Sequence, residues 1–147
     1  MDSHYGLPDI WEGKQVVCFH FPEQNAPDGY NGARYHIDSD GTQFMSDSDW
    51  NHTGACRGGF SDFENGLALM DEAVSTSGGD FAYNSSQYTF GLQINSIADI
   101  NPCDVSECSD TSGAYWSLFH NGQMAMVGIS DLELESDSVI TWSIETW

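Results

Sequence analysis

One segment of the chain has helical periodicity, and the segments around it have strand or loop character. Four apolar residues recur at steps of four, three and four, namely Phe63, Leu67, Met70 and Val74. Ser61 and Glu64 form a candidate capping box before them, and Gly78-Gly79 would end the helix, which we place at residues 62–76. A lone amphipathic helix buries its apolar face on a sheet, so the pattern predicts a two-layer α+β domain.

Strand signals flank this helix on both sides. The predicted strands are residues 15–21, 88–94, 97–100, 115–120, 123–127 and 139–147. In the first strand Val17 and Phe19 share one face, while Val16 and Cys18 share the other. The dipeptide Asn121-Gly122 separates two strands by two residues, which is the strongest short-range signal for a hairpin.

Residues 22–61 are rich in Gly, Asp, Asn and Ser, and we interpret them as a long acidic loop with one short hairpin near residues 33–37. The density of carboxylates makes part of this loop a weak candidate for calcium, at Asp38, Asp40, Asp47 and Asp49. No Glu closes an EF-hand pattern there. A solvated acidic loop is the favoured alternative, and we expect no resident cofactor or metal.

The composition excludes several classes of protein. Among 147 residues there are 23 Asp plus Glu and 3 Lys plus Arg, for a formal net charge of −20. So few cations cannot neutralise a phosphate backbone, and the carboxylates repel an anionic membrane surface. No apolar stretch is long enough for a membrane span. We therefore expect one domain, residues 14–147, behind an irregular N-terminal arm, residues 1–13.

The even number of cysteines favours disulfides. Cys103 and Cys108 would close a local loop, and Cys18 with Cys56 would then tie a strand to the long loop. The pairing is not fixed by sequence, and buried thiols are the alternative. Glycosylation sequons begin at Asn51 and Asn84. These features predict a secreted protein, extracellular or at the cell surface.

The sequence contains no catalytic motif that places a nucleophile beside a base, so we expect a protein that is not an enzyme. Aromatic residues crowd one arm of the hairpin instead, at Tyr115, Trp116 and Phe119. Stiff aromatic side chains beside a tight turn suit ligand recognition. Since side chains alternate along a strand, one set can fill the core while the other meets a partner. Packing of both sets is the plainer alternative.

Three stretches of the sequence resemble one known family. Residues 90–100, 113–129 and 132–142 contain a Gly-led apolar strand, Tyr115-Trp116 opening a hairpin that turns at Asn121-Gly122, then Val127-Gly128, and a closing strand that ends at Trp142. This order resembles the transcobalamin-like C-terminal domain, the smaller β-domain of transcobalamin and intrinsic factor. That domain also occurs alone in bacterial and archaeal secreted proteins.

The resemblance implies a β-grasp-like mixed sheet packed on one helix, with the family's helix at residues 62–76. It also implies cobalamin or another corrinoid as ligand, bound by two segments: Phe90, Gly91, Leu92, Gln93 and Ile94 from one, and Tyr115, Trp116, Ser117, Leu118 and Phe119 from the other. Ser117 replaces a Gln of the animal carriers, and Ser138 replaces a usual Gly. Those carriers complete the site with a helical domain, so the resemblance also implies a partner chain.

Two functions follow as hypotheses. The first is a secreted, non-catalytic binding module for a corrinoid or similar flat ligand. The second is a structural surface or adhesion module that assembles with other proteins or with copies of itself, using residues 1–13 to pair with the edge of a neighbour's sheet.

Overall fold

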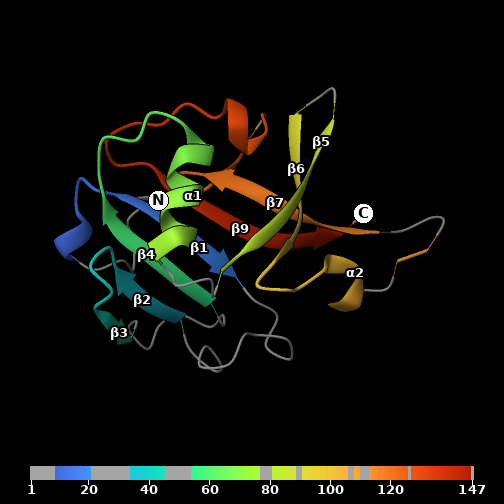
Figure 1. The fold of residues 1–147 in the computed structure, drawn as a ribbon, viewed down its shortest axis with the longest axis horizontal. Coiled ribbons are helices and arrows are strands. Elements are labelled where there is room, and N and C mark those ends of the chain that lie inside the picture. Colours follow the sequence, from blue (N-terminus) through green and yellow to red (C-terminus); the bar gives the residue numbers. More distant parts are fainter. Residues whose placement is uncertain are drawn as a thin grey trace.

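The computed structural model describes residues 9–20, 34–45, 54–76, 81–88, 91–105, 108–109, 113–125 and 127–146. Their main element is a seven-stranded sheet (Figure 1). Its strands are β1 (Gln15–His20), β2 (Arg34–Asp38), β3 (Gln43–Met45), β4 (Gly54–Phe60), β7 (Ala114–His120), β8 (Gln123–Met124) and β9 (Val139–Thr146). A separate hairpin pairs β5 (Tyr83–Tyr88) with β6 (Gly91–Ile97). The helices are α1 (Gly66–Thr76), the single turn α2 (Pro102–Val105), and two 3-10 turns, Asp9–Trp11 and Ile129–Asp131.

The large sheet is mixed. Its order is β3-β2-β4-β1-β9-β7-β8, with β1 parallel to β9, β2 parallel to β4, and the other neighbours antiparallel. Of the described strands, the first (β1) and the last (β9) in the sequence therefore lie side by side at the centre of this sheet. The predicted α+β class is confirmed, whereas the finer β-grasp assignment stays a prediction. None of the described helices is long and apolar enough to cross a membrane.

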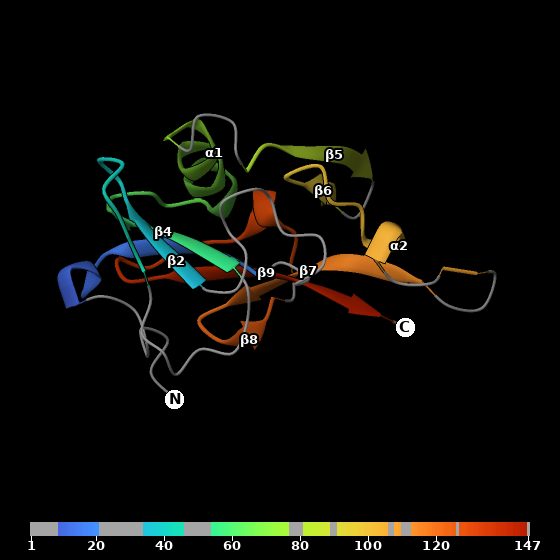
Figure 2. The same ribbon diagram turned by 90° about the horizontal axis from the view of Figure 1, so that it is seen from below.

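Helix α1 and the β5–β6 hairpin cover the same face of the large sheet (Figure 2). Val17 and Phe19 of β1 face this layer and belong to the main core, together with Leu69 and Met70 of α1. Val16 and Cys18 point to the opposite face, where Trp11 joins them in a smaller cluster. The alternation predicted for the first strand is thus observed, with both of its faces buried.

The predicted start of the helix is wrong. Helix α1 begins at Gly66, and the cap is Asn65, whose Oδ1 accepts the backbone N–H groups of Leu67 at 2.9 Å and Ala68 at 3.3 Å. The N–H of Phe63 instead donates to the buried side chain of Gln15, at 3.1 Å. Residues 61–64 therefore run outside the helix, and no Ser61–Glu64 capping box forms.

The buried face of α1 differs from the predicted stripe as well. It consists of Gly66, Leu69, Met70 and Ala73. The other three members of the stripe, Phe63, Leu67 and Val74, are only partly buried against the core. The predicted stop at Gly78-Gly79 lies outside the described residues.

The predicted long acidic loop is not a loop throughout, since it contains β2, β3 and β4. Strand β4 even lies inside the sheet, between β2 and β1. It lacks alternation because Gly58 and Gly59 occupy positions where strands usually carry side chains. Its one cation, Arg57, is 3% exposed and donates to the backbone oxygen of Thr76 at 2.8 Å. A cation there satisfies a carbonyl at the C-terminal end of α1.

The Asn-Gly hairpin is confirmed. Asn121 and Gly122 have φ angles of 52° and 84°, as a type I′ turn requires, and they join β7 to β8. Residues 97–100, in contrast, do not form a separate strand. β6 ends at Ile97, and Ala98 and Asp99 turn the chain with φ angles of 55° and 64°.

Of the predicted N-terminal arm, the structure describes residues 9–13. Trp11 within it is fully buried, and its indole N–H donates to Asp38 Oδ1 at 2.8 Å. This part of the arm is therefore packed onto the domain.

Candidate ligand pocket between the two sheets

A pocket of about 540 Å³ lies between the large sheet and the β5–β6 hairpin. The large sheet contributes Ala114, Tyr115, Trp116, Leu118 and Trp142, β6 contributes Leu92, Gln93 and Ile94, and the segment after β8 contributes Ala125, Val127, Gly128 and Ile129. None of these side chains carries a formal charge. The pocket is thus a mostly apolar space with aromatic rings in its wall.

The geometry of β7 explains why it supplies so much of the wall. Trp116 and Leu118 lie on the face of the large sheet that α1 and the β5–β6 hairpin cover. In the ladder with β9, Trp116 is opposite Ile144, and Leu118 is opposite Trp142. The indole N–H of Trp116 donates to the backbone oxygen of Ile100 at 3.0 Å. This buried hydrogen bond fixes the ring, because a different rotamer would leave the N–H unsatisfied.

The β5–β6 hairpin, which faces β7 across the pocket, is attached to helix α1. The hydroxyl of Tyr83 on β5 donates a short hydrogen bond to Asp71 of α1, and burial together with this carboxylate raises the pKa of Tyr83. The backbone N–H of Ala98 donates to the oxygen of Ala82 at 2.8 Å, which joins the two ends of the hairpin. These contacts hold β6 over the sheet, so the pocket is formed before any ligand enters.

Glycine shapes the last wall of the pocket. A Cβ at Gly128 would lie 3.3 Å from the backbone oxygen of Leu92, which is tighter than most side chains tolerate. The chain after β8 therefore approaches β6 closely at this point. The buried Ile129 follows as the first residue of a 3-10 turn, and it packs near Gly66, the first residue of α1.

The structure brings six of the ten predicted ligand residues together in this wall: Leu92, Gln93, Ile94, Tyr115, Trp116 and Leu118. Ser117, which is 3% exposed, and Phe119 do not line the pocket. Gly91 begins β6 outside the wall, and Phe90 lies outside the described residues.

Sequence reasoning missed Trp142, Ala125 and residues 127–129 as lining residues. The sequence pattern could have indicated Trp142, because the alternation of the last strand places it on one face with Ile140 and Ile144. What the sequence could not supply was the register that sets Trp142 directly opposite Leu118. Val127-Gly128 was recognised only as part of a motif.

The calcium candidates are not gathered into a site within the described ranges. Asp38 accepts the indole N–H of Trp11, and Asp40 accepts the backbone N–H of Thr42 at 2.9 Å. Hydrogen bonding from Thr42 lowers the pKa of Asp40. Asp47 and Asp49 lie outside the described residues, and among those described no three His, Cys, Asp or Glu side chains form a group that could hold a metal ion.

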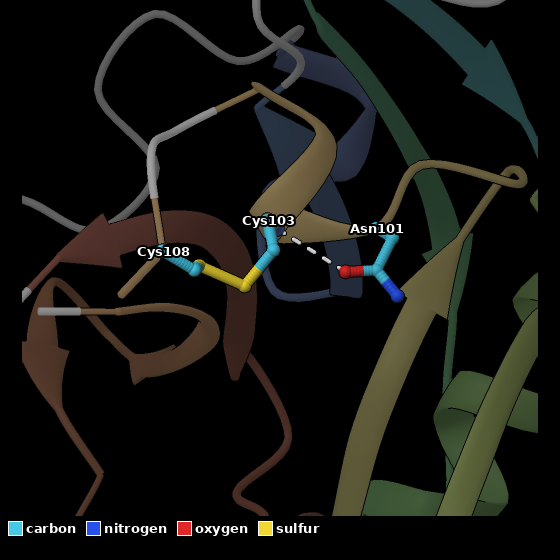
Figure 3. Close-up of a disulfide and its surroundings, with 3 residues drawn as sticks. All are labelled: Asn101, Cys103 and Cys108. Carbon is cyan, nitrogen blue, oxygen red and sulfur yellow. Dashed lines mark hydrogen bonds between the residues drawn. A yellow bond between two sulfur atoms is a disulfide. The ribbon is translucent and has the colours of Figure 1, made fainter. Parts of the chain in front are cut away.

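Both predicted disulfides are present. Cys18 and Cys56 join β1 to β4, and Cys103 and Cys108 close a short loop after β6 (Figure 3). The backbone N–H of Cys103 also donates to Asn101 Oδ1 at 3.1 Å, at the start of α2. The alternative of buried thiols is excluded, since no cysteine is free.

These observations define a small, disulfide-bonded α+β domain with an uncharged pocket between its two sheets. By sequence the chain belongs to a family described as a domain of unknown function, DUF4430, which matches residues 67–146, from α1 to β9. No curated protein matches the chain.

Two solved structures show a distant likeness. One is a Ruminococcus gnavus protein described as a proposed metal binding protein, with 8% identity, a TM-score of 0.46, and coverage of 89% of this chain and 96% of that one. The other is haptocorrin in complex with Cbi, with 15% identity, a TM-score of 0.43, and coverage of 76% of this chain but 24% of haptocorrin. Neither likeness carries a functional argument at these values.

Proposed function

We propose that this protein is a non-catalytic binding module that holds an uncharged, largely apolar edge of a flat ligand in the pocket between β6 and β7. The observation that carries the proposal is the pocket itself, whose wall is uncharged, partly aromatic and built from segments far apart in the sequence. Its volume of about 540 Å³ falls within the roughly 300–1,000 Å³ common for small-molecule sites.

The fixed wall supports binding rather than chemistry. Trp116 is held by its hydrogen bond to Ile100, so little conformational entropy is lost when a ligand packs against it. Among the lining residues, none pairs a nucleophile with a base. A flat ligand would be recognised by contact with the rings and with the aliphatic side chains between them.

The sequence resemblance makes a corrinoid the first ligand to test. In this proposal the pocket takes one edge of the macrocycle, and a partner chain covers the rest. The two disulfides support secretion, because such bonds persist in oxidising compartments outside the cytoplasm.

The alternative hypothesis, a surface or adhesion module that assembles with other chains, has no supporting observation comparable to the pocket. It used residues 1–13 as an arm that pairs with a neighbour, yet Trp11 is fully buried in its own domain. We therefore keep the binding module as the proposed function.

The test is a titration with cobalamin and with the neutral dye Nile red, following tryptophan emission and the melting temperature. Val127 lines the pocket and is 47% exposed, whereas Ile10 is 65% exposed and lies elsewhere. Val127→Arg should weaken binding about tenfold or more, because a guanidinium at the wall must be desolvated by an apolar ligand. Ile10→Arg is the matched control and should bind as the wild type does. No change in melting temperature, and none in tryptophan emission once light absorbed by the ligand is corrected for, with cobalamin at up to millimolar and Nile red at micromolar concentrations would contradict the proposal.

A further inference from the structure

The indole N–H of Trp142 has no hydrogen-bond partner within the described part of the chain. Trp142 is 3% exposed and lines the pocket. The other described tryptophans contrast with it, because Trp11 donates to Asp38 at 2.8 Å and Trp116 donates to Ile100 at 3.0 Å. Trp142 is thus the one described indole whose polar atom is buried and unpaired.

The neighbours of Trp142 in the sheet offer its indole no side-chain acceptor. Trp142 lies in β9 between Phe19 of β1 and Leu118 of β7, and neither neighbour has a polar side-chain atom. A buried donor without an acceptor destabilises a protein, so most buried donors in native structures are satisfied. An apolar residue here would avoid the penalty, which suggests that the acceptor arrives with the occupant of the pocket.

We propose that the ligand carries a neutral hydrogen-bond acceptor, such as a ketone or amide oxygen, that accepts the N–H of Trp142 and makes this residue the specificity determinant of the site. This inference rests on the proposed function. A carboxylate or phosphate would fit poorly, because none of the described lining residues is a cation and the chain has a net charge of −20. In this structure Nε1 is shut off from solvent, so the proposal requires a lining side chain other than the fixed Trp116 to move when the ligand enters.

Fluorene and 9-fluorenone test the inference, because they share one flat fused-ring frame and differ by a ketone oxygen. We expect the wild type to bind fluorenone about five- to tenfold more tightly than fluorene, the range that one satisfied buried donor provides. In a ¹⁵N-correlated spectrum the indole cross-peak of Trp142 should shift downfield with fluorenone and not with fluorene. Trp142→Phe assigns that peak by its disappearance, and it should abolish the preference for fluorenone.

Trp116→Phe is the control, since it removes an indole N–H that is already paired inside the protein. It should keep the preference for fluorenone, whatever it does to affinity overall. The preference and the peak shift are both measured on the wild type, so the test survives if either variant fails to fold. Equal binding of the two probes without a peak shift would overturn the role of Trp142 and leave the pocket function standing. Binding of neither probe would overturn the inference, and the pocket function as well if the cobalamin and Nile red titration also fails.

Discussion

Trp11 occupies the space in which a side chain at Gly58 would stand. A Cβ built at Gly58 would overlap three atoms of the indole ring. The same ring donates its N–H to Asp38, so two contacts hold it over β4. This packing holds the 3-10 turn Asp9–Trp11 against β4, an inner strand of the sheet. Position 58 must be glycine because the indole ring leaves no space for a side chain there.

Gly58→Ala should therefore destabilise the protein by about 1–3 kcal/mol, the usual cost of overpacking a tight site. The measurement is the free energy of unfolding in urea. In a Trp11→Leu background the same change should cost much less, because the smaller side chain can yield. Equal costs in both backgrounds would mean that Trp11 is not the obstacle.

Gln15 provides a second test, because its buried side-chain amide links three segments. The amide nitrogen donates to the backbone oxygens of Phe63 at 2.7 Å and Glu135 at 2.8 Å, and the amide oxygen accepts the N–H of Phe63. Gln15→Met keeps the approximate volume but leaves these backbone groups unsatisfied. We expect a loss of about 2–4 kcal/mol in the free energy of unfolding. Gln123→Met, at an exposed position of β8, should change stability by less than about 0.5 kcal/mol.

The elements that sequence reasoning located are those whose signal is local. The alternation of residues 15–20 and the Asn121-Gly122 turn each follow from neighbouring residues alone. Strand β4 was missed because its structure depends on distant partners: Trp11 fills the space above Gly58, and Arg57 is satisfied by the end of α1. The start of α1 was misplaced for the same reason, since Gln15 takes the N–H of Phe63.

The candidate site divides in the same way. Residues of β6 and β7 could be named in advance because a family motif marks them. The contribution of Trp142 depends on its register with Leu118, and that of Gly128 depends on its approach to Leu92, and both are relations between separate segments. Such relations become visible only when the chain is folded.

The two disulfides should contribute unequally to stability. Cys18–Cys56 closes a loop of 38 residues and Cys103–Cys108 one of 5. Loop-closure entropy then predicts losses of about 4 kcal/mol for Cys18→Ala with Cys56→Ala and about 2 kcal/mol for Cys103→Ser with Cys108→Ser. Urea unfolding without reductant measures both.

The two disulfides should also differ in the rate at which they are reduced, because their cysteines differ in solvent exposure. Cys103 and Cys108 are exposed, while Cys18 and Cys56 are buried at 3% and 0% exposure. Thiol–disulfide exchange requires access to sulfur, so dilute dithiothreitol should reduce Cys103–Cys108 first. Mass spectrometry after timed alkylation reads the order, and early labelling of Cys18 would contradict it.

Alkaline pH should weaken the attachment of the β5–β6 hairpin to α1. Burial, and next the hydrogen bond to Asp71, raise the pKa of Tyr83 in the folded protein above its ordinary value of 10.0. Above that value the unfolded chain loses the phenol proton while the folded chain keeps it, so stability is full below pH 10 and falls as the pH rises further. Urea unfolding at pH 9 and pH 11 should show this fall in the wild type, and Tyr83→Phe should reduce it. Because Tyr83 is partly exposed, the quantity to compare is the fall in unfolding free energy from pH 9 to pH 11 in the wild type and in Tyr83→Phe. An equal fall in both proteins would contradict the role of Tyr83.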